Sequence, residues 1–422
     1  MFNERSIQAC NAATFGVFQK PLYDSYSFSR IPSTIQKLLF ANAEKPLPQD
    51  TYNAGPYDTV VLFLLDSFGW SAFEKFSSSS AFLQRFVDRG IVSKITSQFP
   101  STTTNHVTCM HTGLDVGQSG LYEWFIYEPL VDAAICPLHF SFAKDHGLNT
   151  LTRAGFRAKE LFSFRTFYQI LQEQGASSFV FQHKESANSP YSQALLEGAH
   201  VIGYKNLPEG LTRLGQELER ATGKNYFFFY FGDIDGKGHE FGPDSPQVAA
   251  EVEKTVNRLE LFWQEHLATI KNGCCIVTSD HGMKQIDPKK TWFLNSTLGH
   301  FEEIIKRNQK NELIVPCGSS RDFFLHIQEP YLEQAYNELT QALDGIASVH
   351  KTALLIEEGL FSKASIRLLA RVGNLVLLPY GENSCWWYEP KRFGNTYHGH
   401  HGGLTKEELH TIFLFQRIES IS

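Results

Sequence analysis

The sequence predicts an α/β fold, with a mostly parallel central sheet flanked by helices and a smaller inserted α+β lobe. Short apolar runs rich in Val, Ile and Phe recur along the chain, and each has the length of a buried strand. Stretches with helical periodicity lie between these runs, and alternating strands and helices are typical of βαβ units. The 422 residues also exceed the ~250–300 that one core usually holds, which favours a second unit or an insert.

Turn residues bound each of the expected strands. The strands cover residues 59–65, 91–96, 177–181, 225–231, 274–278, 322–327 and 374–378. Helical periodicity is clearest in residues 164–174, 207–221 and 246–270. Parallel sheets bind ligands at the carboxyl ends of their strands, so these ends are the first place to look for chemistry.

Residues 288–390 differ from the rest of the chain, because their charges are mixed and their apolar runs are shorter. We interpret them as an inserted lobe that shapes the site at these strand ends. Residues 1–287 and 391–422 then form the α/β core.

Composition excludes several classes of protein. The net charge is -7, 42% of the residues are hydrophobic and 20% are charged, which is unlike a disordered chain or one with a clustered basic face for nucleic acid. No signal peptide precedes residue 50, and no apolar run approaches the ~20 residues of a membrane span. These features predict a soluble protein in the cytoplasm. The odd number of cysteines favours reduced thiols.

Carboxylates and imidazoles follow the expected strands. Asp66 follows residues 59–65, and Asp280 and His281 follow residues 274–278. Asp235 and His239 lie four apart across what the glycines indicate is a turn, where both side chains could converge on one cation. The alternative for a single carboxylate such as Asp66 is a helix cap.

A histidine cluster near the C-terminus adds further potential ligands. His398, His400 and His401 lie among glycines, ahead of a capping-box pattern from Thr405 to Glu408. A solvated loop is the alternative for this cluster.

A hydroxyl-rich stretch, residues 101–106, precedes a short helical pattern in residues 107–112. A hydroxyl at a helix N-terminus lies near backbone N–H groups that favour phosphate. The alternative is an ordinary Ser/Thr cap.

Taken together and in this order, these stretches resemble the alkaline phosphatase superfamily, and most closely its nucleotide pyrophosphatase/phosphodiesterase (type I phosphodiesterase) family. The resemblance spans residues 59–287 and 398–404. It implies two zinc ions, with Mn²⁺ suiting the same ligand types. One ion would be held by Asp66, Asp280, His281 and the nucleophile, and the other by Asp235, His239 and His401. His401 is preferred to its neighbours His398 and His400 because it directly precedes a glycine.

The same resemblance implies the nucleophile. An ungapped match through residues 99–113 puts Thr103 on the family's catalytic threonine, and Thr102 is the alternative if the loop shifts by one residue. The match also puts Trp124 where the family has an asparagine that hydrogen-bonds the phosphoryl oxygens, and Asn105 is a candidate replacement. Trp124 and Phe68 are predicted substrate contacts, with a place in the core as the alternative.

The implied activity is that of a two-metal phosphodiesterase or pyrophosphatase with a phosphothreonine intermediate, acting on a small-molecule phosphate ester. A phosphomonoesterase is one alternative. No arginine lies between Gly90 and Gly120, although Arg321 could reach the site from elsewhere. The other alternative is a non-catalytic metal-binding scaffold that interacts with a protein partner.

Overall fold

A seven-stranded sheet forms the centre of the computed structural model, which describes residues 1–418. Side by side, the strands are β4 (Ile91–Thr96), β20 (His410–Ile418), β11 (Gly273–Thr278), β3 (Thr59–Leu65), β10 (Lys224–Phe231), β8 (Ala176–His183) and β9 (His200–Tyr204). β3 is parallel to β10 and β11, whereas β20 is antiparallel to β11 and β4. The prediction of a mostly parallel sheet is therefore confirmed, although β9 and β20 were not among the expected strands.

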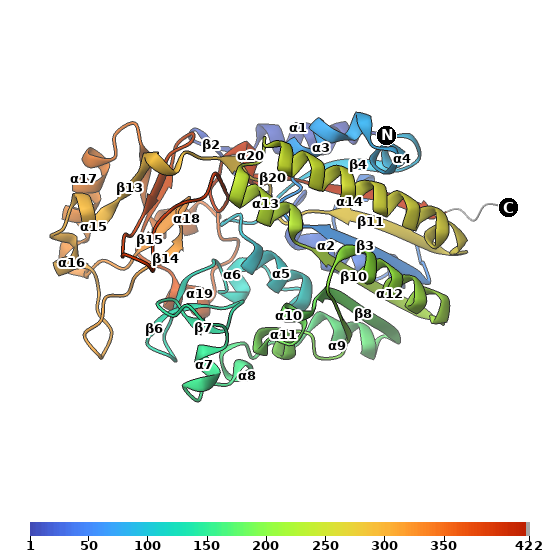
Figure 1. Cartoon of the computed structure of the whole chain (residues 1–422), viewed down its shortest axis with the longest axis horizontal. Coiled ribbons are helices and arrows are strands. Elements are labelled where there is room, and N and C mark those ends of the chain that lie inside the picture. The colour runs from blue at the N-terminus through green and yellow to red at the C-terminus, as the bar shows by residue number, and fades with distance from the viewer. Residues whose placement is uncertain (419–422) are drawn as a thin grey trace.

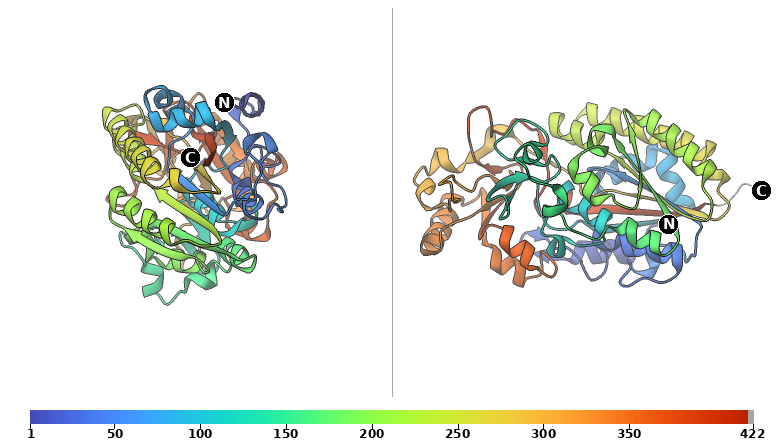
Figure 2. Two further views of the ribbon diagram at one scale, coloured as in Figure 1. Left: turned by 90° about the vertical axis from the view of Figure 1, so that its right-hand side faces the viewer. Right: turned by 90° about the horizontal axis from the view of Figure 1, so that it is seen from below.

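Both faces of the sheet are covered by helices (Figures 1 and 2). In β3, alternate side chains enter different cores: Val61, Phe63 and Leu65 face one core, and Val60, Leu62 and Leu64 face the other. The first core is closed by α3 (Trp70–Phe76), α4 (Ala81–Arg89), α12 (Leu207–Arg220) and α14 (Pro246–Glu265). The second is closed by α2 (Ile31–Phe40), α5 (Thr103–Thr112) and α9 (Phe167–Glu173). This double burial explains why the strand sequences are continuously apolar.

A lobe lies at one end of the molecule, on the left in Figure 1. Its antiparallel sheet contains, side by side, β14 (Cys317–Ser319), β15 (Asp322–Leu325), β17 (Leu375–Pro379) and β16 (Ala347–Lys351). β13 (Thr291–Phe293) pairs with β18 (Ser384–Trp386), and α15 (Leu294–Thr297), α16 (Phe301–Ile304), α17 (Leu332–Ala342), α18 (Thr352–Glu357) and α19 (Ile366–Arg371) complete the lobe.

A second small sheet, which precedes residue 288 in the chain, shares the apolar core of the lobe. It consists of β5 (Ile126–Glu128), β6 (Ala133–Cys136) and β7 (Ser141–Phe142), and Phe125 forms a β-bridge with Gly318 of the lobe. Side chains from Val116 to Phe162 belong to the same buried cluster as those of the lobe. The division at residues 288 and 390 stays a prediction.

The glycine-rich stretch expected to form a turn is a helix, α13 (Asp233–Phe241), which is a correction to the sequence analysis. The capping box at Thr405 is confirmed at the start of α20 (Lys406–Leu409). All seven cysteines are buried and free, as expected for reduced thiols. Within residues 1–418, no helix is both long and apolar enough to cross a membrane.

Candidate metal centre and substrate cavity

The predicted ligands lie at the carboxyl ends of three neighbouring strands. Asp66 follows β3, Asp280 and His281 follow β11, and Asp235 and His239 lie on α13, which follows β10. The strand order β11-β3-β10 brings these ends together. His401 comes from the loop before α20, far along the chain.

One group of donors surrounds Nε2 of His281. This atom lies 3.5 Å from Asp66 Oδ1 and 3.4 Å from Asp280 Oδ2. The Thr103 hydroxyl oxygen lies 3.2 Å from the same nitrogen and 3.5 Å from Asp66 Oδ2. Two carboxylates, an imidazole and a hydroxyl therefore converge on one volume.

The second group adjoins the first. His239 Nε2 lies 3.5 Å from Asp235 Oδ2 and 3.1 Å from His401 Nε2, which itself lies 3.6 Å from Asp235 Oδ1. The rings of His281 and His401 stack with centroids 3.7 Å apart, which links the two groups. Two overlapping sets have ligand atoms within 4.8 Å of one another: Asp66, Asp280 and His281 form one, and Asp235, His281 and His401 the other.

Backbone carbonyls orient the three imidazoles. Nδ1 of His239 lies 2.9 Å from the Gly399 carbonyl oxygen, Nδ1 of His281 lies 3.0 Å from that of Gly282, and Nδ1 of His401 lies 2.9 Å from that of Ser101. A carbonyl can only accept, so each Nδ1 carries the proton and each Nε2 keeps its lone pair. This is the usual arrangement around histidines that ligate a metal.

The carboxylates have oxygens that no protein group satisfies. Asp66 Oδ1, Asp235 Oδ1 and Asp280 Oδ2 are buried and accept no hydrogen bond. Burial raises the pKa of all three carboxyls, that of Asp280 to about 7, and the neighbouring Asp280 adds to the rise for Asp66. Burial also lowers the pKa of His281 and His401 well below the usual value. Neutral imidazoles beside unpaired carboxylate oxygens fit a divalent cation.

The two candidate nucleophiles differ in what they face. Thr103 is the first residue of α5, and its hydroxyl contacts both Asp66 and His281. Thr102 is the N-cap residue of the same helix, and its side chain makes no capping hydrogen bond. Of the two hydroxyls, that of Thr103 hydrogen-bonds the potential metal ligands.

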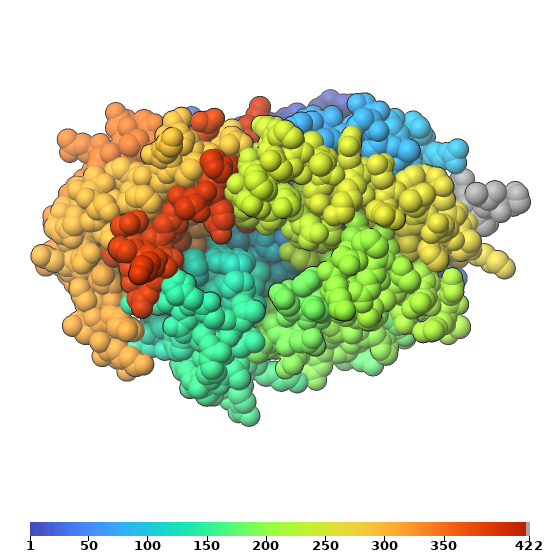
Figure 3. Space-filling model, in the orientation of Figure 1, coloured from blue at the N-terminus to red at the C-terminus, as the bar shows by residue number. Residues whose placement is uncertain are grey.

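A cavity of about 320 Å³ opens beside Thr103. One side of the cavity is formed by Thr102 and by the candidate metal ligands Asp235, His239 and His401. The other walls are formed by Glu123, Trp124, Phe125, Gly318, Ser319, Ser320, Trp386, Arg392, Phe393, Gly394, Asn395, Tyr397 and His400. Figure 3 shows the hollow, bordered by the segments near residue 120 (teal), α13 (yellow-green) and the segment near residue 390 (red).

Trp124 lines this cavity, as predicted for a substrate contact. Sequence reasoning missed Glu123, Arg392 and Tyr397 as wall residues, although Glu123 directly precedes Trp124 and Tyr397 directly precedes the histidine cluster. Burial raises the pKa of Glu123 to about 8, and its Oε1 accepts no hydrogen bond. Only the adjacent Glu123-Trp124 pair, at a mismatch with the family pattern, could have signalled this wall.

Three residues that the sequence analysis considered for the site lie outside the cavity: Phe68 and Asn105, which were predicted site residues, and Arg321, which was named as an arginine that could reach it. Phe68 is fully buried in the apolar core on one face of the central sheet. Asn105 is also fully buried, and its amide donates to the carbonyl oxygens of Pro100 and Tyr122. Arg321 is 1% exposed and pairs with Glu408 at 2.9 Å. Packing and hydrogen bonding therefore hold all three away from a substrate in this cavity.

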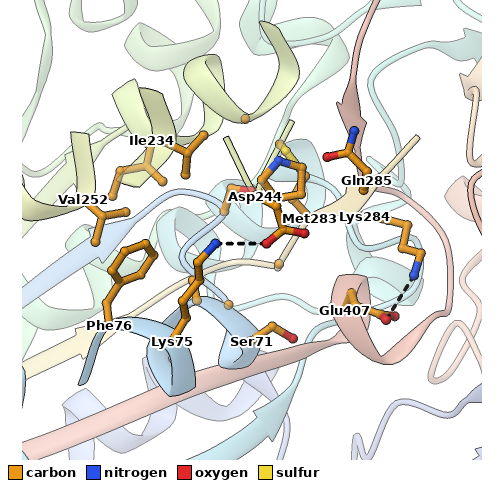
Figure 4. Close-up of a pocket in the computed structure, with 17 residues that line it drawn as sticks. Ser71, Lys75, Phe76, Ile234, Asp244, Val252, Met283, Lys284, Gln285 and Glu407 are labelled. Atoms are coloured by element: carbon orange, nitrogen blue, oxygen red, sulfur yellow. Dashed lines mark hydrogen bonds and ion pairs between the residues drawn. The ribbon is translucent and has the colours of Figure 1, made fainter. Parts of the chain in front are cut away.

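A smaller cavity of about 160 Å³ adjoins the segments that carry the candidate ligands. It is lined by chain neighbours of the ligands, such as Ser67, Gly238 and Gly282. Figure 4 shows two ion pairs among its lining residues, Lys75 with Asp244 and Lys284 with Glu407, each at 3.0 Å. None of the ligand side chains lines it, so the larger cavity is the candidate substrate site.

Several known proteins are similar to this chain. A family model described as type I phosphodiesterase / nucleotide pyrophosphatase matches residues 60–404. Human ectonucleotide pyrophosphatase/phosphodiesterase family member 7 is 41% identical over 64 residues, which cover 14% of each chain. Its rat counterpart is 27% identical over 151 residues, 33% of this chain and 31% of that protein. The chain thus matches less than a third of the length of these curated relatives.

Solved structures share the fold over most of the chain. Murine ectonucleotide pyrophosphatase/phosphodiesterase 5 has a TM-score of 0.65 at 18% identity, covering 85% of this chain and 87% of that one. The same murine protein, as an inactive threonine-to-alanine variant in complex with AMP, has a TM-score of 0.63 at 17% identity, with the same coverage. The human protein has a TM-score of 0.64 at 18% identity, covering 86% and 90%.

Proposed function

Because the chain belongs to the type I phosphodiesterase/nucleotide pyrophosphatase family, whose members are phosphoric ester hydrolases, we propose that it is a two-metal phosphodiesterase or pyrophosphatase with Thr103 as nucleophile. The observation that carries this proposal is the convergence of three carboxylates and three imidazoles beside the Thr103 hydroxyl. Asp66, Asp280 and His281 would hold one divalent cation, together with Thr103. The other cation would be held by Asp235, His239 and His401.

Zinc ions in such a site would stabilise a deprotonated hydroxyl and the charge that develops on the phosphoryl oxygens. The chain supplies the geometry for this chemistry. The Nδ1–H groups of the three histidines are bonded to carbonyl oxygens, which keeps each Nε2 directed into the site. Mn²⁺ suits the same ligand types, whereas nitrogen and oxygen donors in tetrahedral geometry favour zinc.

The Thr103 oxygen would attack the phosphorus atom and the bond to the leaving oxygen would break, which yields a phosphothreonine and the first product. Water would then attack the same phosphorus atom, release the second product and restore the hydroxyl. The relative that was solved as an inactive threonine-to-alanine variant supports a threonine in this role. The contacts of Thr103 with Asp66 and His281 favour it over Thr102.

The proposed substrate is a diester or a pyrophosphate. The cavity continues from Thr103 along Trp124 and Trp386, so it can hold a group attached to the phosphorus atom. A relative bound to AMP supports a nucleotide-like group in that place. Arg321, which a monoesterase could have used, is buried in an ion pair with Glu408.

We also propose a cytoplasmic location. Seven buried free thiols are compatible with a reducing compartment. The relatives are named ectonucleotide enzymes, so fractionation of cells that express the chain is the direct test.

The test of the activity compares hydrolysis of a bis-aryl phosphate with that of a mono-aryl phosphate. Each is measured after chelation and again after Zn²⁺ or Mn²⁺ is added. We expect faster turnover of the diester, loss with chelator and recovery with metal. A strong preference for the monoester would overturn the diesterase assignment, and no hydrolysis of either ester even after metal is added would favour the scaffold alternative.

A further inference from the structure

We infer that a turn in the lobe, residues 319–322, positions the metal ligand His401 through the Ser319 hydroxyl and the buried Arg321–Glu408 ion pair. We call these residues the lobe turn. The inference rests on the proposed metal site. It adds that occupancy of one half of that site depends on the lobe, whereas the aspartates and the histidine of the other half directly follow strands of the central sheet.

The segment that carries His401 has little regular structure of its own. Apart from the two residues of β19 (Gly399–His400), residues 401–405 form a glycine-containing loop. One side of this loop is tied to Ser101 near the nucleophile: the Gly402 N–H donates to Ser101 Oγ at 3.1 Å, and Ser101 Oγ donates to the Gly403 carbonyl at 2.7 Å. A loop of this kind needs a second support to hold one geometry.

The lobe turn supplies that support from the opposite side. Ser319 Oγ lies 3.2 Å from the His401 carbonyl oxygen and 2.5 Å from Asp322 Oδ1. Gly402 has a φ of +124°, and a Cβ at this position would lie 2.6 Å from both Asp322 Oδ1 and Ser319 Oγ. The loop backbone therefore packs directly against the lobe turn, and no larger residue fits there.

The ion pair fastens the far end of the loop. Arg321 Nε and Nη2 donate to the two carboxylate oxygens of Glu408, at 2.9 and 3.1 Å. Glu408 also accepts from the Gly403 N–H at 3.1 Å and from the Thr405 hydroxyl at 2.8 Å. Both charged side chains are completely buried, and a bidentate pair in such a place is strongly directional.

The other ligand group is built differently. Asp66, Asp280 and His281 follow directly from β3 and β11 in the middle of the sheet. The Asp280 carboxylate accepts from the backbone N–H groups of Ser67 and His281, at 3.2 and 3.0 Å, so it is held within the core. Loosening the lobe turn should therefore weaken metal binding at Asp235, His239 and His401 and spare this group.

The experiment titrates metal-free protein with Zn²⁺ alone and follows the heat of binding. Wild type is expected to bind two ions. Arg321→Met is expected to weaken one site by about 10- to 100-fold, as outer ligands of metal sites do when removed, and to leave the other unchanged. Ser319→Ala, a smaller change, should weaken the same site in the same direction.

The matched control is Arg371→Met. Arg371 forms another buried pair with a glutamate of the lobe region, donating from Nε to Glu128 at 2.9 Å and from Nη1 to the Ser119 carbonyl at 3.2 Å. These partners lie outside the loop that carries His401. The control should lose stability but keep both zinc sites.

Three outcomes would overturn the inference: two unchanged sites in both Arg321→Met and Ser319→Ala, equal weakening of both sites, or selective loss in the Arg371→Met control as well. If Arg321→Met does not fold, zinc binding by Ser319→Ala and by the Arg371→Met control still tests the role of the lobe turn. Failure of wild type itself to bind zinc would count against the proposed function rather than against the role of the lobe turn.

Discussion

At the scale of single residues, the site depends on which atom of each side chain is left free. In three histidines Nδ1 is hydrogen-bonded to a backbone carbonyl oxygen, and in three aspartates one buried carboxylate oxygen has no hydrogen-bond partner. Unsatisfied buried carboxylate oxygens are costly, so a native protein retains them where a cation offsets the cost. Thr103 lies among these atoms, whereas Thr102 is the N-cap residue of the same helix and its side chain makes no capping hydrogen bond.

Replacing Thr103 by alanine should reduce turnover by about 10³-fold or more, because the attacking oxygen is removed. The first-product burst should disappear while zinc binding by the six remaining ligands persists. Stopped-flow measurement with an aryl diester follows the turnover and the burst, and titration with Zn²⁺ follows the metal binding. Thr102→Ala is the matched control, and we expect it to keep the burst. The reverse result would move the nucleophile by one residue.

A second residue-scale prediction concerns His111, which is buried on α5 and hydrogen-bonds the Tyr168 hydroxyl at 2.8 Å. Burial lowers its pKa to about 3. The unfolded chain binds a proton at this residue below pH ~6.5 and the folded chain does not, so folding is favoured above that pH and weakened as pH falls. This residue alone should remove about 2 kcal/mol of unfolding free energy between pH 7 and pH 5.

Urea unfolding at the two pH values tests this. His111→Phe should lose about 2 kcal/mol less on acidification than wild type, whatever its stability at pH 7. His146, which is exposed, gives the control His146→Gln with the wild-type dependence. Equal losses in wild type and His111→Phe would contradict the prediction.

At the scale of elements, α13 shows how tertiary contacts override local preference. Two glycines, Gly236 and Gly238, each cost a helix about 1 kcal/mol relative to alanine, which is why the sequence indicates a turn. In the structure Gly238 packs against Met283, and a Cβ there would lie 2.4 Å from the Met283 sulfur. The helix puts Asp235 and His239 four residues apart on one face, within reach of one cation.

The two glycines of α13 should respond in opposite ways to alanine. Gly236 has open space around its Cβ position, so Gly236→Ala should raise the unfolding free energy by about 0.5–1 kcal/mol. Gly238→Ala should lower it by about 1–3 kcal/mol, because Met283 must move within a packed region. Chemical denaturation measures both. If the two substitutions change the unfolding free energy by similar amounts, the contact with Met283 does not determine the effect of Gly238→Ala.

At the scale of the whole molecule, core and lobe meet around the site. Most of the candidate ligands follow strands of the central sheet, and the lobe together with residues 123–125 and 392–397 supplies most of the cavity wall. Because residues from Val116 to Phe162 share the apolar core of the lobe, the two parts are not separate modules joined by a linker. Metal bound in the site should therefore stabilise the whole fold rather than one strand end.

Removing metal should lower the melting temperature. A site saturated at 100 times its dissociation constant adds about 2.7 kcal/mol to the unfolding free energy. Scanning calorimetry of protein with added Zn²⁺ and with chelator measures the shift. Asp280→Asn, which leaves one charged ligand fewer, should show a smaller shift than wild type. A melting temperature that is independent of zinc would rule out a metal site in the folded state.

The sequence by itself predicted five of the seven strands of the central sheet and the candidate metal ligands. Fully buried strands must be apolar throughout, and ligands follow strand ends at recognisable spacings, so both leave local signals at positions such as Asp66 and Asp280. The resemblance over residues 99–113 implies Thr103 as the nucleophile, and this role stays a prediction.

Only the tertiary structure decided the rest. Whether Asn105, Phe68 and Arg321 face the substrate or the interior depends on partners distant in the chain, such as Tyr122 and Glu408. The same holds for the helical state of α13 and for Glu123, Arg392 and Tyr397 in the cavity wall. Contacts between segments that are separated in the chain, by 17 residues for Asn105 and Tyr122 and by 87 for Arg321 and Glu408, leave no periodic or motif signal in either segment.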